Sequence, residues 1–138
     1  MIYAALSAVG AALVAIFAKI GLKDVDSTVA TIVRGVIMAI ILVLGGLVFG
    51  KFKGFSLSDF SGKAWLFIIL AAFAGAASWI FYFIALKGGP ASAVAVIDKM
   101  SVVLVILLAA IFLGEAFTVK TAIGTILVAL GGILIVLK

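Results

Sequence analysis

Long apolar runs separated by short polar stretches dominate the 138-residue chain. Each run holds about 18 to 23 residues, the length that a helix needs to cross about 30 Å of hydrocarbon at about 1.5 Å per residue. The pattern predicts an all-α membrane protein, a bundle of five transmembrane helices in one domain. We expect these helices at residues 2–20, 28–49, 63–86, 90–113 and 118–137.

Local signals place the helix boundaries. Asp26 or Ser27 can cap the second helix, and Thr118 can cap the fifth. Gly89 and Pro90 suit the end of the third helix and the start of the fourth. The first helix lacks the basic start and the cleavage site of a signal peptide, so we expect it to be part of the fold.

The longest loop, residues 50–62, is rich in lysine, serine and glycine. Its polar groups would be unpaired in hydrocarbon, so it must lie at a membrane surface. The apolar residues within it either lie in the headgroup region or pack back on the helix ends. They are Phe52, Phe55, Leu57 and Phe60.

Composition supports a lipid environment. The chain is 68% hydrophobic and 11% charged, too apolar for a soluble domain of this size. With no cysteine and no histidine, we expect no disulfide, no metal site, no cofactor and no enzymatic activity. The ten basic residues are scattered, so the net charge of +5 does not indicate nucleic acid as a partner. We expect a multi-pass protein of the cell membrane.

Loop charges bear on orientation, because an odd number of spans puts the termini on opposite sides. Basic anchors on the N-terminal side are Lys51, Lys53, Lys63 and Lys120, and those on the other side are Lys19, Lys23, Lys87 and Lys138. The balance favours insertion in both orientations. Alternatively, Arg34 and Lys99 act as weak anchors that place the second side in the cytoplasm.

Several segments together resemble a known family. They are Ala18-Lys19-Ile20-Gly21-Leu22 with Arg34 in the next helix, Ala85-Leu86-Lys87-Gly88-Gly89-Pro90-Ala91-Ser92, and Phe112-Leu113-Gly114-Glu115 before a glycine-spaced last helix. In this order they resemble the EamA-type domain of the drug/metabolite transporter superfamily, and the length resembles its half-size members. The resemblance implies a secondary transporter and one inverted-repeat unit of a ten-helix architecture. Many relatives have a proline midway along the fourth helix where this chain has Ile97-Asp98-Lys99-Met100, so their pocket chemistry does not carry over.

Inverted repeats place the substrate between the two halves near the bilayer midplane. A half-size chain can obtain its second half from an inverted copy, so we expect an antiparallel homodimer. Small residues in the last helix let helices approach closely in lipid, and their spacing resembles the dimerising helix of small multidrug resistance transporters. They are Thr121, Gly124, Thr125, Gly131 and Gly132. The alternative is that this stripe packs only within its own subunit.

Arg34, Asp98 and Lys99 lie inside predicted helices, where a charge costs about 2.5 kcal/mol or more and needs a partner or a wet cavity. Asp98 and Lys99 are about 100° apart on a helix, which favours Arg34 as the partner of Asp98. Three roles are open. The set forms a structural ion pair, with Lys99 reaching the headgroups, or it lines a substrate cavity in which Asp98 pairs or exchanges a proton, or the ion pair acts as a gate.

The charge balance bears on the cargo. Lys19, Arg34 and Lys99 outnumber Asp98, which favours a small polar or anionic metabolite as substrate. A cation or drug exporter would need Asp98 unpaired. The other alternative is a non-transporting membrane subunit that pairs with another half-size chain.

Large rings lie midway along the third predicted helix. Ser78 shares a face with Tyr82, and Trp79 shares one with Phe83, because each pair is four residues apart. Ser78, Trp79 and Tyr82 either line the cavity or contact lipid and neighbouring helices. Glu115 precedes the fifth helix, where a carboxylate suits the positive helix end.

Overall fold

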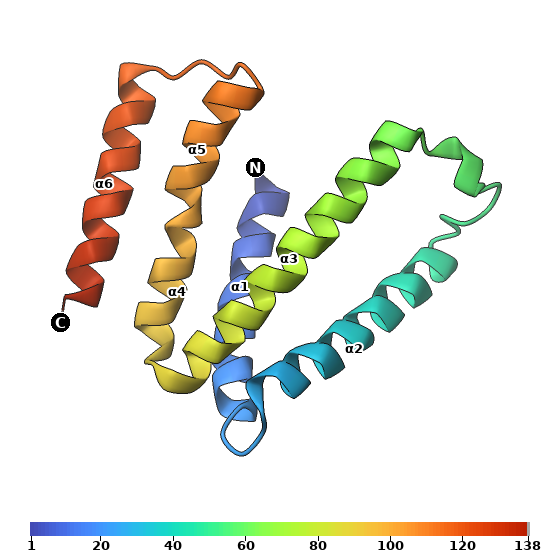
Figure 1. Ribbon diagram of the computed structural model, residues 1–138, viewed down its shortest axis with the longest axis horizontal. Coiled ribbons are helices and arrows are strands. Elements are labelled where there is room, and N and C mark those ends of the chain that lie inside the picture. The colour runs from blue at the N-terminus through green and yellow to red at the C-terminus, as the bar shows by residue number, and fades with distance from the viewer. Residues whose placement is uncertain (138) are drawn as a thin grey trace. The chain divides into compact units, whose positions relative to one another are not determined.

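The computed structural model describes residues 1–137, in which every regular element is helical. Lys138, counted above as a loop anchor, lies outside the described residues. The elements are α1 (Ile2–Gly21), α2 (Ser27–Val48), η1 (Leu57–Asp59), α3 (Gly62–Gly88), α4 (Ala91–Lys99), α5 (Ser101–Phe112) and α6 (Val119–Val136) (Figure 1). Five segments are long and apolar enough to cross a membrane, which confirms the predicted fold class.

The chain folds as two compact units. The first unit contains Met1–Lys19 together with the chain from Gly88 onward, and the second is Ile20–Lys87. In the first unit, α6 runs beside α4 and α5 (Figure 1). In the second unit, α2 and α3 are joined by a loop that contains η1.

The fourth span, predicted at residues 90–113, contains an interruption that the sequence did not predict. It divides at Met100 into α4 and α5, although Ala91–Phe112 as a whole can span a membrane. Neither proline nor glycine lies at the break. Met100 has φ −61° and ψ −18°, and its N–H donates to the Ile97 carbonyl three residues back, as in a 3₁₀ turn. This tight turn interrupts the α-helical hydrogen bonds and creates a joint in the span.

Small side chains form the buried part of the first unit. Val94, Ala109 and Thr125 are buried, one from each of α4, α5 and α6. Thr118 caps α6 as predicted, since its hydroxyl accepts a hydrogen bond from the Thr121 N–H at 3.2 Å. Small and medium side chains therefore fill the space between these three helices at the buried positions.

The core of the second unit lies where α2 begins and α3 ends. Leu22, Phe83 and Leu86 are exposed by 2%, 3% and 0%. Thr31 is also buried, and its hydroxyl donates to the Ser27 carbonyl at 2.7 Å, so this polar group is satisfied within the helix. The rest of α2 and α3 extends beyond this small core.

Asp26 caps α2, as one of the two sequence alternatives predicted. Its Oδ1 accepts hydrogen bonds from the N–H groups of Thr28 at 2.9 Å and Val29 at 3.0 Å. These bonds stabilise the ionised form, and the bond from Val29 is the main reason that the pKa of Asp26 lies below its ordinary value of 3.8. Lys87 donates to the Val25 carbonyl at 2.7 Å, which ties the end of α3 to the same turn.

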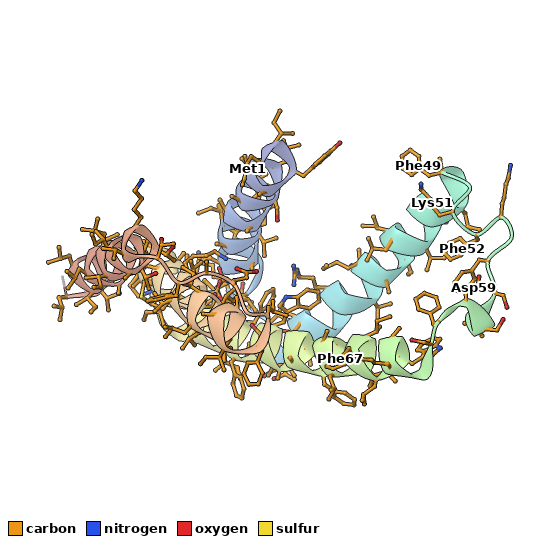
Figure 2. All side chains as sticks on the ribbon, turned by 90° about the horizontal axis from the view of Figure 1, so that it is seen from above. Met1, Phe49, Lys51, Phe52, Asp59 and Phe67 are labelled. Carbon is orange, nitrogen blue, oxygen red and sulfur yellow. The ribbon has the colours of Figure 1, made fainter. Side chains whose placement is uncertain are left out.

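The loop after α2 packs back on the helix ends, the second of the two alternatives for residues 50–62. Phe52 lies against Gly46 of α2. Its ring is 5.9 Å from that of Phe55, which is 5.9 Å from that of Phe60, and Phe60 is 5.4 Å from Trp65 of α3, all between centroids. Figure 2 shows this end of the second unit, with Phe52 and Asp59 on the loop side of α2. The aromatic chain links the two helices at the loop end.

Candidate functional site

Arg34 lies on the side of α2 that meets α3. Its guanidinium carbon Cζ is 4.5 Å from the centroid of the Trp79 ring and 5.4 Å from that of the Phe83 ring. Trp79 and Phe83 are four residues apart, so both rings project from one face of α3. A guanidinium is attracted to such ring faces by about 0.5–2 kcal/mol. The rings therefore hold the cation in place without neutralising its charge.

One nitrogen of this guanidinium is buried and unpaired. Within residues 1–137, Nη1 of Arg34 is the one buried side-chain nitrogen or oxygen that lacks a hydrogen-bond partner. An unsatisfied donor on a charged group is costly in a low-dielectric setting, and native structures retain few of them. A carboxylate, sulfonate or phosphate oxygen is the acceptor that this donor fits best. Arg34 is thus a cation held by two rings, with one buried donor that the described chain leaves without an acceptor.

A groove of about 500 Å³ opens between α2 and α3. Its lining includes Thr31 and Gly35 of α2 and Ala72, Gly75, Ala76 and Trp79 of α3. We call it the α2–α3 groove. Trp79 belongs both to the groove wall and to the stack under Arg34. Its volume is in the range of small-molecule sites.

Asp98 and Lys99 pair with each other, which corrects the expectation that they would not. Lys99 Nζ lies 3.0 Å from Asp98 Oδ2, with side-chain exposures of 60% and 32%. The expectation assumed a continuing regular helix, but α4 ends at Lys99, and a long lysine side chain can fold back there. Arg34 and Asp98 belong to different units, so their pairing stays a prediction.

Three further candidates have different surroundings. Lys19 is half-buried and donates to the Gly89 carbonyl at 2.7 Å, which ties the end of α1 to the turn before α4. Ser78 is exposed on α3, and Tyr82 is half-buried with its ring 6.3 Å from that of Phe83. Of the predicted polar-aromatic faces, the face with Trp79 and Phe83 places both of its rings against the Arg34 guanidinium.

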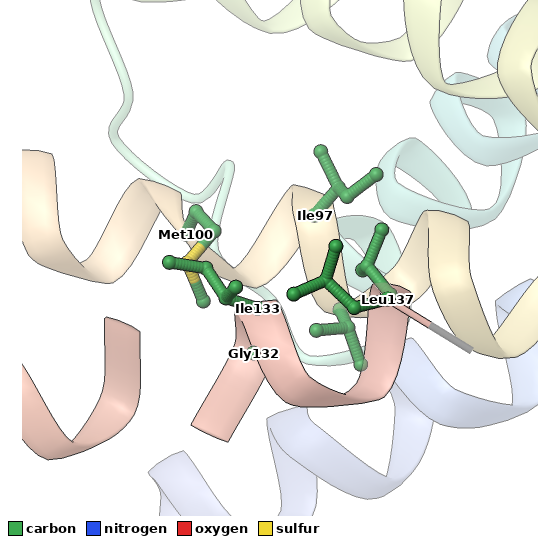
Figure 3. A pocket seen from close by; sticks show the side chains of 7 residues that line it. Ile97, Met100, Gly132, Ile133 and Leu137 are labelled. Atoms are coloured by element: carbon green, nitrogen blue, oxygen red, sulfur yellow. The ribbon is translucent and has the colours of Figure 1, made fainter. Parts of the chain in front are cut away.

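Met100 fits into a notch on α6. Its thioether lies over Gly132, where an added methyl group would collide with it, and Val96 is also close (Figure 3). A small apolar cavity of about 160 Å³ adjoins this contact, lined from α4 and α6 by residues that include Ile97 and Ile133. The interruption of the fourth span at Met100 therefore packs against Gly132, where α6 has no side chain.

The small residues of α6 divide into two groups. Thr125 and Gly132 are buried within the described chain, and the Thr125 hydroxyl donates to the Thr121 carbonyl at 2.8 Å. Gly124 and Gly131 are exposed, and nothing lies within 4 Å of a Cβ built on either. The alternative of packing within the subunit therefore holds for one group, and the other group is open.

Phe83, Met100 and the α2–α3 groove were not among the predicted site features. The spacing of Trp79 and Phe83 was visible in the sequence, but it did not show which cation the rings would meet. The groove could have been suspected from small residues that recur at positions 71, 72, 75 and 76. Such residues are common in membrane helices, so that signal is weak.

Comparison with known proteins places these features in context. The sequence pattern that defines the EamA-like transporter family matches residues 1–137. A protein of Sinorhizobium sp. named "Uncharacterized transporter in cobO 3'region" is 39% identical over 133 residues, which are 96% of this chain and 93% of that protein. No solved structure matches the chain.

Proposed function

Because the chain belongs to the EamA-like transporter family and is a multi-pass membrane protein, we propose that it is a secondary transporter of a small polar or anionic metabolite. Transport proceeds by alternating access, without an enzymatic step. The observation that carries the choice of cargo is the Arg34 guanidinium, which is stacked on Trp79 and Phe83 and has a buried donor unused. An anion that pairs with it satisfies that donor.

The working unit in this proposal is an antiparallel homodimer in the cell membrane. Inverted pairing supplies the second half of the substrate path, and the even spread of loop lysines agrees with insertion in both orientations. Gly124 and Gly131 are the contact that we assign to it, because they are exposed and seven residues apart on α6. Gly131→Leu is then expected to convert a cross-linkable dimer into a monomer.

The test of the cargo begins with detergent-solubilised protein and a thermal-shift screen of anionic, zwitterionic and cationic metabolites. Anions that stabilise the protein are then tested by counterflow in proteoliposomes. Arg34→Gln should lower affinity for them roughly 10- to 100-fold, since a charge-assisted hydrogen bond contributes about 1.5–3 kcal/mol. Arg34→Lys should recover little, because an ammonium lacks the planar fork and its stacking. Lys53→Gln in the exposed loop is the matched control for loss of one positive charge.

Asp98 is our candidate for coupling transport to protons, with Lys99 as its partner and as a second attraction for the anion. Asp98→Asn should abolish uptake driven by a proton gradient while leaving counterflow of unlabelled against labelled solute. Unchanged pH dependence in that variant would exclude Asp98 as the proton carrier. We also propose Lys19, Ser78 and Tyr82 as cavity residues, although fewer contacts support them than support Arg34 and Trp79.

Two other functions have distinct outcomes in the same experiments. A non-transporting subunit would be strictly monomeric alone and would move no solute in liposomes. A cation or drug exporter would be stabilised by lipophilic cations and would lose that response in Asp98→Asn. The pairing of Asp98 with Lys99 speaks against the exporter, because its carboxylate is already neutralised.

A further inference from the structure

Trp79 connects two features of the second unit that would otherwise be separate. One is the Arg34 guanidinium, 4.5 Å from the centroid of the indole ring, and the other is the groove that the same residue lines. A molecule whose charged group pairs with the Arg34 guanidinium can therefore extend along the indole into the groove. The charged and the apolar parts of one ligand would have adjoining places.

The groove itself offers apolar contact. Apart from Trp79, it is lined by aliphatic residues, glycine and Thr31. The Thr31 hydroxyl already donates its hydrogen to the Ser27 carbonyl, which leaves no free donor there. A hydrocarbon or aromatic group would be accepted in this space, whereas a sugar or a second charge would lose its hydrogen bonds with water.

Two glycines widen the groove, although the backbone conformation does not require glycine at either position. A Cβ built at Gly35 or Gly75 meets no other heavy atom within 4 Å, and neither residue has a positive φ. Glycine inside a helix is less favourable than alanine, so local stability does not explain these residues. Their effect is to leave volume between α2 and α3.

We infer that the groove binds the apolar body of a free organic anion whose acid group pairs with Arg34. The substrate class narrows to amphipathic monoanions with a compact aliphatic or aromatic body. This inference rests on the transport function proposed above. The occupant that we propose for the groove is a free solute and not the acyl chain of a phospholipid.

The probes are linear alkanesulfonates from methanesulfonate to hexanesulfonate, together with benzenesulfonate. Sulfonates stay ionised at every working pH, so they do not cross the bilayer as neutral acids. The chain has two tryptophans, and Trp65→Phe leaves Trp79 as the single reporter of binding by fluorescence. We expect affinity to rise up to fourfold per methylene, which corresponds to about 0.8 kcal/mol for each buried CH₂.

Filling the groove should remove the gain from the longer body alone. Gly75→Leu is expected to lower the affinity for hexanesulfonate to that for methanesulfonate, with methanesulfonate itself unchanged. Ala74→Leu is the matched control, because it adds the same group on an exposed position of α3 outside the groove lining. Arg34→Gln should lower the affinity for every sulfonate by the same factor.

The outcomes separate this inference from the proposed function. Sulfonate binding that is independent of chain length, or equal weakening of short and long probes by Gly75→Leu, overturns the inference even if anions are transported. Chain-length-dependent binding without transport in liposomes supports the groove and counts against the transport function. A short-chain phosphatidylglycerol that displaces hexanesulfonate and binds more tightly than any sulfonate assigns the groove to lipid, which also overturns the inference.

Discussion

Glycines serve opposite purposes in the two units of this chain. In the first unit, Gly132 of α6 admits the Met100 side chain, so the missing Cβ is replaced by a neighbour. In the second unit, Gly35 and Gly75 have no neighbour where their side chains would be, and the space belongs to the α2–α3 groove. The first arrangement lets two helices pack closely, and the second leaves space between two helices.

The charges follow the same division. Lys99 in the first unit is paired with Asp98 at 3.0 Å, whereas Arg34 in the second unit is supported by two rings and has a nitrogen unpaired within the described chain. An ion pair that is already formed offers little to a ligand, whereas a stacked guanidinium keeps its charge and a donor. In the transport function proposed above, this contrast favours Arg34 over Lys99 as the main partner of the anion.

The largest expected effect is on the closed glycine. Gly132→Leu should lower the free energy of unfolding by about 1–3 kcal/mol, because the added side chain and Met100 compete for one space. Adding Met100→Ala to Gly132→Leu should restore most of the lost free energy of unfolding. Such non-additivity is expected for two residues that are in contact. Unfolding in detergent, followed by circular dichroism on the diluted monomer, provides the measurement. Gly131→Leu is the control, since its Cβ meets nothing within 4 Å, and an equal loss there would contradict the notch.

The same substitution to alanine should have the opposite sign in the open groove. Gly35→Ala and Gly75→Ala are each expected to raise the free energy of unfolding by about 0.5–1 kcal/mol, the ordinary advantage of alanine over glycine inside a helix. Gly132→Ala should lower it. Unfolding curves of the three variants, recorded under one set of conditions, test the comparison directly. If the free energy of unfolding changed with the same sign in all three variants, the proposed contrast between the glycines would be wrong.

The ion pair of the first unit should contribute less than either glycine effect. A double-mutant cycle of Asp98→Asn and Lys99→Met is expected to give a coupling energy of about 0.2–0.5 kcal/mol, because the Lys99 side chain is 60% exposed. The same unfolding assay, with and without added salt, measures it. A coupling of about 3 kcal/mol or more would instead indicate a deeply buried pair and would weaken the contrast with Arg34.

Much of the fold was predictable from the sequence because its causes are local. Apolar runs of spanning length gave the helix positions, and the capping chemistry of Asp26 and Thr118 placed two helix starts. The break at Met100 was not predictable in this way, since it contains neither proline nor glycine and depends on hydrogen bonds within a tight turn. The pairing of Asp98 with Lys99 was missed for the same reason, because the prediction assumed a helix that continues.

The candidate site was predictable only in part. Arg34 was expected to need a partner because a charge in a membrane helix is costly. The identity of that partner depends on which face of α3 meets α2, and Trp79 and Phe83 are about 45 residues away in the sequence. The volume of the groove depends on that same approach of two helices. Neither follows from periodicity along one helix.

The smallest effect concerns Asp26, outside the membrane-spanning segments. Because hydrogen bonds, chiefly from Val29, lower the pKa of Asp26 in the folded chain, its stabilising effect is fully present above the ordinary value of 3.8. The effect is lost as the pH falls from there through the lowered folded-state pKa. Asp26→Ala should therefore reduce thermal stability slightly at neutral pH and not at all in strong acid. Melting curves between neutral and acid pH test this, with Asp24→Ala as the control, since Asp24 accepts no hydrogen bond in the part of the chain that the structure describes. A difference between Asp26→Ala and the parent that persists undiminished in strong acid would show that the side chain acts through packing and not as a charged cap.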